Sequence, residues 1–506
     1  MRVNTVRGGL AAFVAAIAAS GASADVTARQ VWDDMRGYME DMGYSVTASD
    51  STAGDTLTVR DMTMALELPE DEGEVQISLP ELRFVENGDG TVTISYPETM
   101  PIHVVARPED EPATDVRIDL SQTGLEIVVS GDPADSMSYV YGAERVGLSL
   151  AEVVVDGEML PPDDARADLT LTGLSGTATV GSGPLRAIEQ TQAVDRVDYD
   201  VSFVDFESDS GGRLEIKGSL NALTSESLAR IPENMNPDDM SAAFREGYAV
   251  EGSLGYTGGA SEFSFEEEGE TVRGTTRAAE GGLAVALDAE RFSYEITGRG
   301  TEISVESAEL PFPVDFRMDR TALSFAVPLT RSEEPRAFSV GLTLGDFTMS
   351  DGLWNIFDPG EMLPRDPATV SLDLDGLGRV LVDVFDPAAM EEMDEPGQLE
   401  AVTLNSLAVR AAGAELTGEG AFTFDNADTE TFNGMPRPEG SLDLRLAGAN
   451  ALIDTLVAMG LLPEEQAMGT RMMLSMFAVP AGDDVLESNI TIDGEGQVLA
   501  NGQRIQ

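Results

Sequence analysis

One strand pattern recurs along this chain from end to end. Two alternating apolar residues are followed by a two-residue step, and the alternation then resumes out of phase. Copies occupy residues 57–64, 77–84, 148–155, 201–206, 342–349, 372–377 and 402–409. Because side chains alternate between the faces of a strand, one inserted residue sends the later apolar set to the other face unless the strand bulges there. The pattern therefore predicts many bent, strongly twisted strands in one large sheet system.

The patterning as a whole predicts a mainly β protein: an elongated, twisted antiparallel sheet system with an N-terminal helix, short mid-chain helices and a C-terminal helical pair. Thr27 and Gln30 have capping-box spacing, which favours a helix over residues 25–43. Strands joined by short turns should follow. Turns are expected at residues 87–90, 122–124, 258–259 and 281–282.

The strand pattern is interrupted in several places. We expect a short helical piece at residues 224–231 and a second helix that Asn236 caps and that runs to residues 244–246. Another helical turn falls within residues 351–360, before an extended connector at residues 363–367. Helices over residues 449–459 and 463–477 precede a final hairpin. These breaks divide the chain into three predicted units, residues 25–220, 221–350 and 351–506.

The first residues have the pattern of a cleavable signal peptide. Arg2 and Arg7 precede a short apolar run, and residues 22–24 form a small-residue cleavage site before Asp25. An uncleaved anchor would need about 20 apolar residues, and this run is shorter. We therefore expect residues 1–24 to be removed and the protein to be periplasmic. No later segment is long and apolar enough to span a bilayer as a helix.

The charge of the chain excludes some partners. It has 31 basic and 91 acidic residues, a net charge of −60, and Lys217 is the sole lysine. Such a field repels phosphate backbones, so nucleic-acid binding is excluded. The simpler explanation of the acidity is a solvated surface adapted to salt. The functional alternative is that the acidic residues bind calcium or a cationic partner. The chain has no cysteine, so disulfides and thiolate metal sites are absent.

The sequence offers little catalytic chemistry. His103 is the only histidine and lies in a strand pattern, so a catalytic triad or zinc site has too few residues to be built. Clustered acids lie beside turns, but none has EF-hand spacing. The pairs are Asp373 with Asp375, Asp425 with Asp428, and Asp493 with Glu495. We therefore assign no catalytic residue, no metal site and no cofactor.

A methionine-rich segment is the strongest candidate for ligand contact. The predicted C-terminal helical pair carries Met459, Met468, Met472, Met473 and Met476. Methionine packs adaptably and suits flexible contact surfaces. Packing into the core is the simpler interpretation, and the functional one is a lid or plug over an apolar groove.

Four short sequence motifs in the C-terminal half resemble those of a known family. They are Leu-Trp-Asn-Ile-Phe-Asp-Pro at residues 353–359, Leu-Pro-Arg-Asp-Pro at 363–367, Gly-Ala-Asn-Ala-Leu-Ile-Asp at 448–454 and Ala-Asn-Gly-Gln-Arg at 500–504. Together they resemble an uncharacterised family of exported alphaproteobacterial proteins, domain of unknown function twenty-one twenty-five. The family has no established activity, so no site residue is implied. The strand pattern also looks loosely like repetitive sheet proteins of the bacterial envelope, some of which hold lipid in grooves.

The leading hypothesis is a non-enzymatic periplasmic protein of the cell envelope that binds lipid or another hydrophobic ligand in a groove of its sheets. It rests on sheets with apolar residues on alternating faces and on the methionine-rich helices. Two alternatives remain: a carboxylate-dependent hydrolase of envelope glycans, and a structural scaffold with an envelope protein as its partner.

Overall fold

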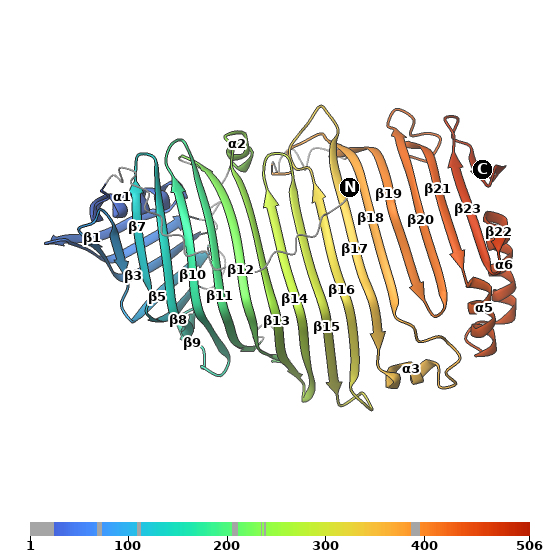
Figure 1. Cartoon of the computed structure of the whole chain (residues 1–506), viewed down its shortest axis with the longest axis horizontal. Coiled ribbons are helices and arrows are strands. Elements are labelled where there is room, and N and C mark those ends of the chain that lie inside the picture. Colours follow the sequence, from blue (N-terminus) through green and yellow to red (C-terminus); the bar gives the residue numbers. More distant parts are fainter. Residues whose placement is uncertain are drawn as a thin grey trace.

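The computed structural model describes residues 25–67, 73–108, 113–204, 211–233, 235–236, 239–385 and 395–505 (Figure 1). The predicted signal peptide at residues 1–24 lies outside the described residues. The rest is mainly β, as predicted, and forms one large antiparallel sheet with helices at both ends and in mid-chain.

The strands lengthen after the N-terminal region and reach 20 residues in β8, β11 and β12. Their bounds are β1 (Ser45–Ala53), β2 (Thr56–Glu67), β3 (Gly73–Glu86), β4 (Val92–Ser95), β5 (Thr99–Pro108), β6 (Thr114–Thr123), β7 (Glu126–Asp132), β8 (Ser136–Val155), β9 (Glu158–Met159), β10 (Ala165–Gly181), β11 (Leu185–Val204), β12 (Arg213–Pro232), β13 (Ala249–Glu267), β14 (Glu270–Leu287), β15 (Phe292–Ser307), β16 (Val314–Val327), β17 (Arg336–Met349), β18 (Ala368–Val380), β19 (Gly397–Ala411), β20 (Ala414–Asp425), β21 (Arg437–Ala447), β22 (Val479–Gly482), β23 (Val485–Ile492), β24 (Val498–Ala500) and β25 (Gln503–Arg504).

The sheet is a simple meander. From β11 to β20 each strand pairs with the strand before it and the strand after it in the sequence, as Figure 1 shows, and β10 pairs with β8 and β11. At the C-terminal end β21 pairs with β23, whose other edge holds β22 and β24. Short connections between antiparallel neighbours explain this order.

The N-terminal strands follow the same order with two interruptions. The hairpin predicted around residues 87–90 is confirmed, since Phe84 pairs with Ile94. The hairpin expected around residues 122–124 is wrong: β6 and β7 do not pair with each other but lie in line along β8. Gly124, with φ +67°, interrupts one long strand there instead of reversing it.

Four of the seven out-of-phase steps of the strand pattern coincide with bulges. The register of β17 against β18 shifts between Leu344 and Phe347, and the intervening Asp346 has a left-handed φ of 54°. Similar shifts accompany the copies in β2, β8 and β19. Each bulge returns the later apolar residues to the face that the earlier ones occupy.

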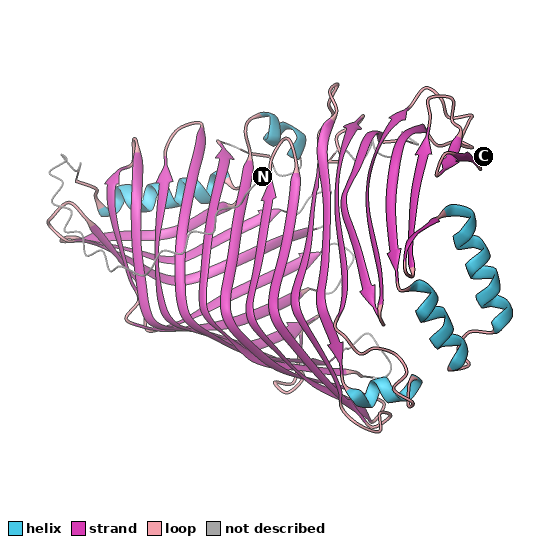
Figure 2. Cartoon of the chain, turned by 45° about the vertical axis from the view of Figure 1, so that its right-hand side comes forward, coloured by secondary structure: helices cyan, strands magenta, loops and turns pink. Residues whose placement is uncertain are grey.

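A second set of left-handed residues lies at one level across neighbouring strands. Gly173 in β10, Ala222 in β12, Gly258 in β13 and Gly300 in β15 all have positive φ, and each falls where the register skips. The long strands bend part-way along their length (Figure 2). We attribute the bend to this line of residues, because a left-handed residue changes the direction of a strand.

Two local predictions are corrected by sheet pairing. Residues 224–231 are not helical, because β12 runs through them and bonds to β11 and β13 on both sides. The glycines at 258–259 and 281–282 are not turns but lie inside β13 and β14. Tyr256 is the register partner of Gly281, and its ring occupies the space that a side chain at Gly281 would need.

Four of the helices follow the prediction closely. They are α1 (Ala28–Asp41), α3 (Asp351–Phe357), α5 (Ala449–Ala458) and α6 (Glu464–Phe477). In α1 the capping box of Thr27 and Gln30 is present. The helix expected to begin after Asn236 begins later: α2 (Met240–Arg245) is capped by Asp239, whose carboxylate accepts the Ala242 amide hydrogen at 2.8 Å.

The predicted division into three units stays a prediction. The boundary at residues 220–221 falls within β12, and hydrogen bonds continue from β12 to β13. The boundary at residues 350–351 falls between β17 and α3, but β17 pairs with β18 across it.

Candidate functional site

One face of the sheet is apolar over most of its length. Antiparallel register partners lie on the same face, so the pairings assign each side chain to a face. Away from the strand ends, the register-paired positions on one face of the described strands β12–β21 carry no charged residue. The charged residues alternate onto the other face. We call the two sides the apolar face and the polar face.

A continuous row of aliphatic side chains crosses the apolar face. Its members are direct register partners from one strand to the next. This aliphatic row consists of Leu254, Leu283, Ile296, Leu323, Leu342, Leu372 and Leu407, on β13 to β19. At about 4.8 Å between strands, the row spans roughly 29 Å.

The middle of the aliphatic row is open to solvent. The exposed fractions are 38% for Leu283, 40% for Ile296 and 42% for Leu323. Exposed aliphatic residues are common singly, but three adjacent members of one row form a contiguous apolar surface. The sequence-based expectation of apolar residues on alternating faces is corrected here, because the bulges keep them on one face.

The apolar face is more buried beside the bend. Val194, Val197 and Leu223 lie on either side of the bend and form a buried cluster. Leu220, Leu254 and Tyr256 pack against this cluster. Side chains crowd on the inner side of a bend, so this burial indicates that the strands bend toward the apolar face.

Helix α1 covers the apolar face at the N-terminal end. Val31 and Trp32 of α1 are buried in one cluster with side chains of β1 to β4, β7 and β8, including Leu57 and Phe84. Trp32 and Phe84 have ring centroids 6.0 Å apart. The sheet is thus rolled around α1 at this end, and the face is filled with protein there.

A buried ion pair fixes α1 against β11. The Arg186 guanidinium lies 3.1 Å from the Asp34 carboxylate, and both side chains are only 14% exposed. It also lies 5.8 Å from the centre of the Tyr38 ring. Burial raises the pKa of Asp34 although Arg186 opposes the change. The pair therefore stabilises the closed end only while both partners are present.

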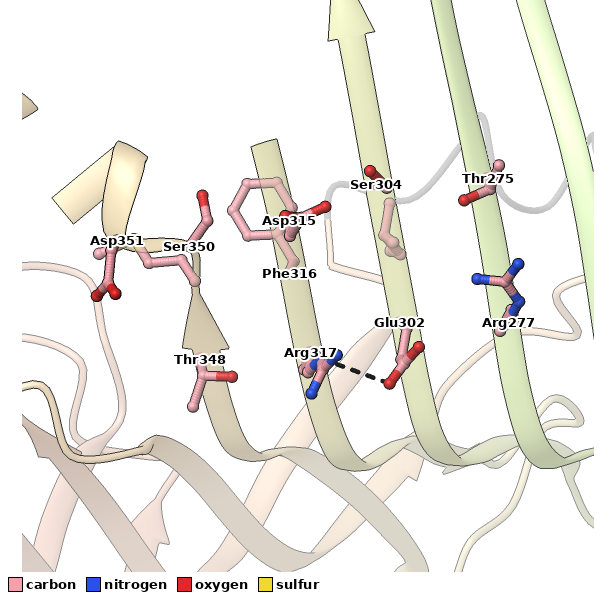
Figure 3. Close-up of a pocket in the computed structure, with 12 residues that line it drawn as sticks. Thr275, Arg277, Glu302, Ser304, Asp315, Phe316, Arg317, Thr348, Ser350 and Asp351 are labelled. Carbon is pink, nitrogen blue, oxygen red and sulfur yellow. Dashed lines mark ion pairs between the residues drawn. The ribbon is translucent and has the colours of Figure 1, made fainter. Parts of the chain in front are cut away.

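Open depressions lie on the polar face. The one in Figure 3 has a volume of about 550 Å³ and is lined by Thr275, Arg277, Glu302, Ser304, Asp315, Arg317 and other residues. Arg317 lies 3.4 Å from Glu302, and both are well exposed. A glycosidase needs two carboxylates flanking the scissile bond, one of them in an environment that keeps it protonated as the general acid. An exposed Glu302 paired with an arginine does not provide that environment.

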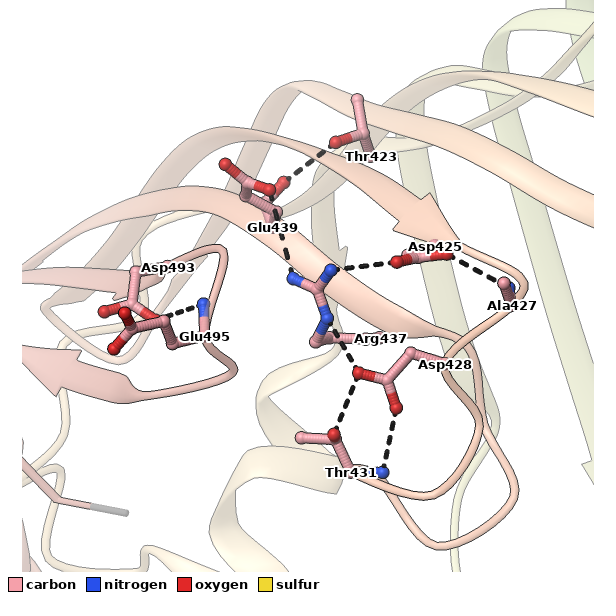
Figure 4. Close-up of polar contacts among 9 residues, drawn as sticks. All are labelled: Thr423, Asp425, Ala427, Asp428, Thr431, Arg437, Glu439, Asp493 and Glu495. Carbon is pink, nitrogen blue, oxygen red and sulfur yellow. Dashed lines mark hydrogen bonds and ion pairs between the residues drawn. The ribbon is translucent and has the colours of Figure 1, made fainter.

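The acid clusters near the C-terminus are occupied by protein groups. In Figure 4, Arg437 contacts Asp425 and Asp428, each at 2.9 Å, and lies 4.0 Å from Glu439. The Thr431 amide and hydroxyl hydrogens, and then Arg437, hold the pKa of Asp428 below its usual value. Arg437 thus takes the place that a cation would fill.

The other predicted acid pairs are also held by polar contacts. The Asn405 side chain donates to Asp373 at 3.2 Å and to Asp375 at 2.7 Å. Asp493 accepts the Glu495 amide hydrogen within a turn. Among the described residues, no three His, Cys, Asp or Glu side chains form a group that could hold a metal ion.

His103 lies on the polar face of β5. Its register partners are Ser78 and Arg117, and its side chain is exposed. Among the described residues, no side-chain hydrogen bond links His103 to Ser78 or to a carboxylate, so these residues do not form a catalytic triad.

The methionines predicted as ligand contacts gather on the C-terminal helices. Met459 follows α5 and is half-buried, whereas Met468, Met472, Met473 and Met476 are 57–69% exposed on α6. The structure thus brings four of them together on one helix, at the C-terminal end of the sheet (Figure 2). Side chains this exposed do not cover the apolar face, and their role as ligand contacts stays a prediction.

Sequence patterns missed the apolar face itself. The signal was present in the two-residue steps, which in β2, β8, β17 and β19 return the later apolar residues to their original face. Finding the face required the strand register, which no local pattern supplies. Within the part of the chain that the structure describes, no helix is long and apolar enough to cross a bilayer.

Comparison with known proteins identifies the family but no function. No curated protein matches the chain. Residues 218–502 match DUF2125, which is described as an uncharacterized protein conserved in bacteria. The match includes the motifs at residues 353–367 and 448–454 that carry the resemblance in the sequence, and it includes the whole aliphatic row. The chain therefore belongs to the DUF2125 family of uncharacterized proteins conserved in bacteria.

Proposed function

We propose that this protein is a non-enzymatic, periplasmic protein of the cell envelope that holds the acyl chains of lipids on the apolar face of its sheet. The observation that carries the proposal is the open stretch of the aliphatic row at Leu283, Ile296 and Leu323. Covering this stretch would remove apolar surface from water, which is favourable by about 25 cal/mol per Å².

The chemistry of the face favours an acyl chain over an extended polypeptide. The backbone of the inner strands is already bonded to neighbouring strands on both sides. An extended peptide lying on the face would leave its own amide groups without partners there, which is costly. A helix such as α1 bonds its own amide groups and is not subject to this cost. An acyl chain has no polar groups along its length and incurs no such cost.

The dimensions of the row also suit an acyl chain. One leaflet of a bilayer core is roughly 15 Å thick, which is half of the full core. A chain of that length laid across the strands would contact about four members of the row. The row as a whole could then hold two such chains end to end.

The test is ligand uptake by the delipidated protein, beginning at Asp25. We expect saturable binding of a fluorescent C16 fatty acid and extraction of lipid from protein purified without delipidation. Absence of both results would reject lipid binding. Cell fractionation and N-terminal sequencing test the location, and the mature protein should begin at Asp25 in the periplasmic fraction.

The rival hydrolase and scaffold hypotheses give different results. A hydrolase should release products from envelope glycans and lose activity on Asp→Asn or Glu→Gln substitution on the polar face. A scaffold should bind one envelope protein in fixed stoichiometry and no lipid.

A further inference from the structure

Helix α6 presents an apolar surface that nothing in the described chain covers. Met468, Met472 and Met476 follow one another at four-residue spacing, and Met473 and Phe477 form the adjacent row. The exposed fractions are 69% for Met468 and Met472, and 60% for Met476. Ala467 is the only buried residue of α6 and lies on the opposite side of the helix. We call these five exposed residues the α6 stripe.

The segment around the α6 stripe differs from the rest of the chain in charge. Residues 466–482 contain no acidic residue, although the chain has 91 acids among 506 residues. The only charged side chain in this segment, Arg471, bonds to Asp454 at 2.5 Å and is thereby neutralised. The stripe itself therefore carries no charge on a strongly acidic molecule, although Glu464 and Glu465 lie in the first turn of α6.

The polar side chains between the methionines bond within the helix. The Thr470 hydroxyl donates to the Gln466 carbonyl oxygen at 3.0 Å, and the Ser475 hydroxyl donates to the Met472 carbonyl oxygen at 2.8 Å. These hydroxyls can enter an apolar environment without losing their bonds. Protein interfaces are also enriched in Met and Phe, but their hot-spot anchors are usually Tyr, Trp or Arg, and the stripe has none of these three.

From these observations we propose that the α6 stripe docks on the surface of a phospholipid bilayer. Unbranched methionine side chains can enter the boundary between headgroups and acyl chains, as in other amphipathic interfacial helices. The net charge of −60 would repel an anionic membrane, so the structure favours a zwitterionic one.

The location of α6 links this docking to the proposed lipid-binding face. Ser488, on the apolar face of β23, donates its hydroxyl to the Phe477 carbonyl oxygen at 2.6 Å. The end of α6 is thus tied to the apolar face at the C-terminal end, opposite the end that α1 closes. Docking there would place the apolar face next to the lipids that it is proposed to hold. This link rests on the proposed function, whereas the docking itself does not.

Oxidation footprinting tests the docking on the unaltered protein. Hydrogen peroxide oxidises exposed methionines to sulfoxide, and mass spectrometry follows each one. Matched internal controls exist, because Met159 and Met435 are 63% and 64% exposed but lie elsewhere. With phosphatidylcholine vesicles, the α6 methionines should become at least fivefold slower to oxidise, and the two controls should not change.

Flotation with the same vesicles is the second measurement. Met472→Glu should reduce the floated fraction at least tenfold, and Met435→Glu should leave it unchanged. Equal oxidation with and without vesicles, or equal flotation of the two variants, would overturn the docking. Protection that appears without vesicles as protein concentration rises, together with a dimer in light scattering, would assign the stripe to a second copy and overturn it too.

The two proposals can fail separately. Uptake of the fluorescent fatty acid is measured in solution without vesicles, so it does not depend on docking. Loss of uptake by the unaltered protein with retained flotation would reject lipid binding alone.

Discussion

Replacing Leu323 by serine should weaken acyl-chain binding without unfolding the sheet. Leu323 lies at the centre of the aliphatic row and is 42% exposed, so a bound chain would cover that remaining fraction. Full burial of a leucine side chain contributes about 1.5–3 kcal/mol, which leaves about 0.6–1.3 kcal/mol for the ligand to gain at this position. The dissociation constant should therefore rise roughly 3- to 9-fold.

Extending the change along the row should enlarge the effect. Leu283 and Ile296 are 38% and 40% exposed and are linked to Leu323 by direct register pairing. Substituting all three by serine should remove about 1.8–3.6 kcal/mol, or roughly 20- to 400-fold in affinity, if the contributions add. Titration with the fluorescent C16 fatty acid measures both variants.

The control lies on the other face of the same sheet. Val140 is 54% exposed on the polar face of β8, so Val140→Ser removes a similar apolar side chain away from the row. We expect its dissociation constant to stay within twofold of the unaltered protein. Circular dichroism should confirm that all variants fold. Equal weakening by Val140→Ser and Leu323→Ser would refute the assignment of the site to the apolar face.

Three other substitutions test interactions that stabilise the fold. Arg186→Met should lower the free energy of unfolding by about 3 kcal/mol at pH 7, because it leaves Asp34 buried without its partner. Gly281→Ala should cost about 1–3 kcal/mol in thermal unfolding, because the added methyl group would overlap the Tyr256 ring. Asp484→Ala should cost about 1 kcal/mol and increase amide exchange in α5, because Asp484 accepts the first amide hydrogens of that helix.

Each of these changes has its own control. The loss of stability caused by Arg186→Met should be smaller at lower pH. Folding raises the pKa of Asp34, so the folded state favours its protonated form. Stability is therefore lost as pH rises through that pKa and is regained on acidification. A deficit that does not change with pH would contradict this. Gly252→Ala should be tolerated, because the nearest atom to the added methyl group is 3.8 Å away. The stabilisation that Asp484 provides should be lost only at a pH below the usual pKa range of aspartate, since the Ala451 amide hydrogen lowers the pKa of Asp484.

The sequence predicted the positions of the strands better than the face of the sheet on which each side chain lies. The two-residue steps predicted bulges, and Asp346 occupies one of them with a left-handed φ. The helix expected over residues 224–231 failed because local helix propensity is weak beside hydrogen bonds to two neighbouring strands. The turn predicted at residues 281–282 is wrong because Gly281 leaves space for the ring of Tyr256, which is distant in sequence.

The candidate site shows the same limit. The methionines of α6 were identified from composition and spacing, but their exposure depends on how α6 packs against α5 and the sheet edge. The aliphatic row is invisible in any single strand, because each strand contributes one residue to it. Only the register of β13 to β19 brings these residues together.

The meander order has a consequence for how this chain acquires its structure. Every long strand finds its hydrogen-bond partners in the segments just before and just after it, so no strand waits for a distant part of the polypeptide. Local partners shorten the loops that must close and speed folding for a β protein of this size. The ladder can thus grow hairpin by hairpin from the amino end as the chain emerges, with each new strand covering the edge left by the last.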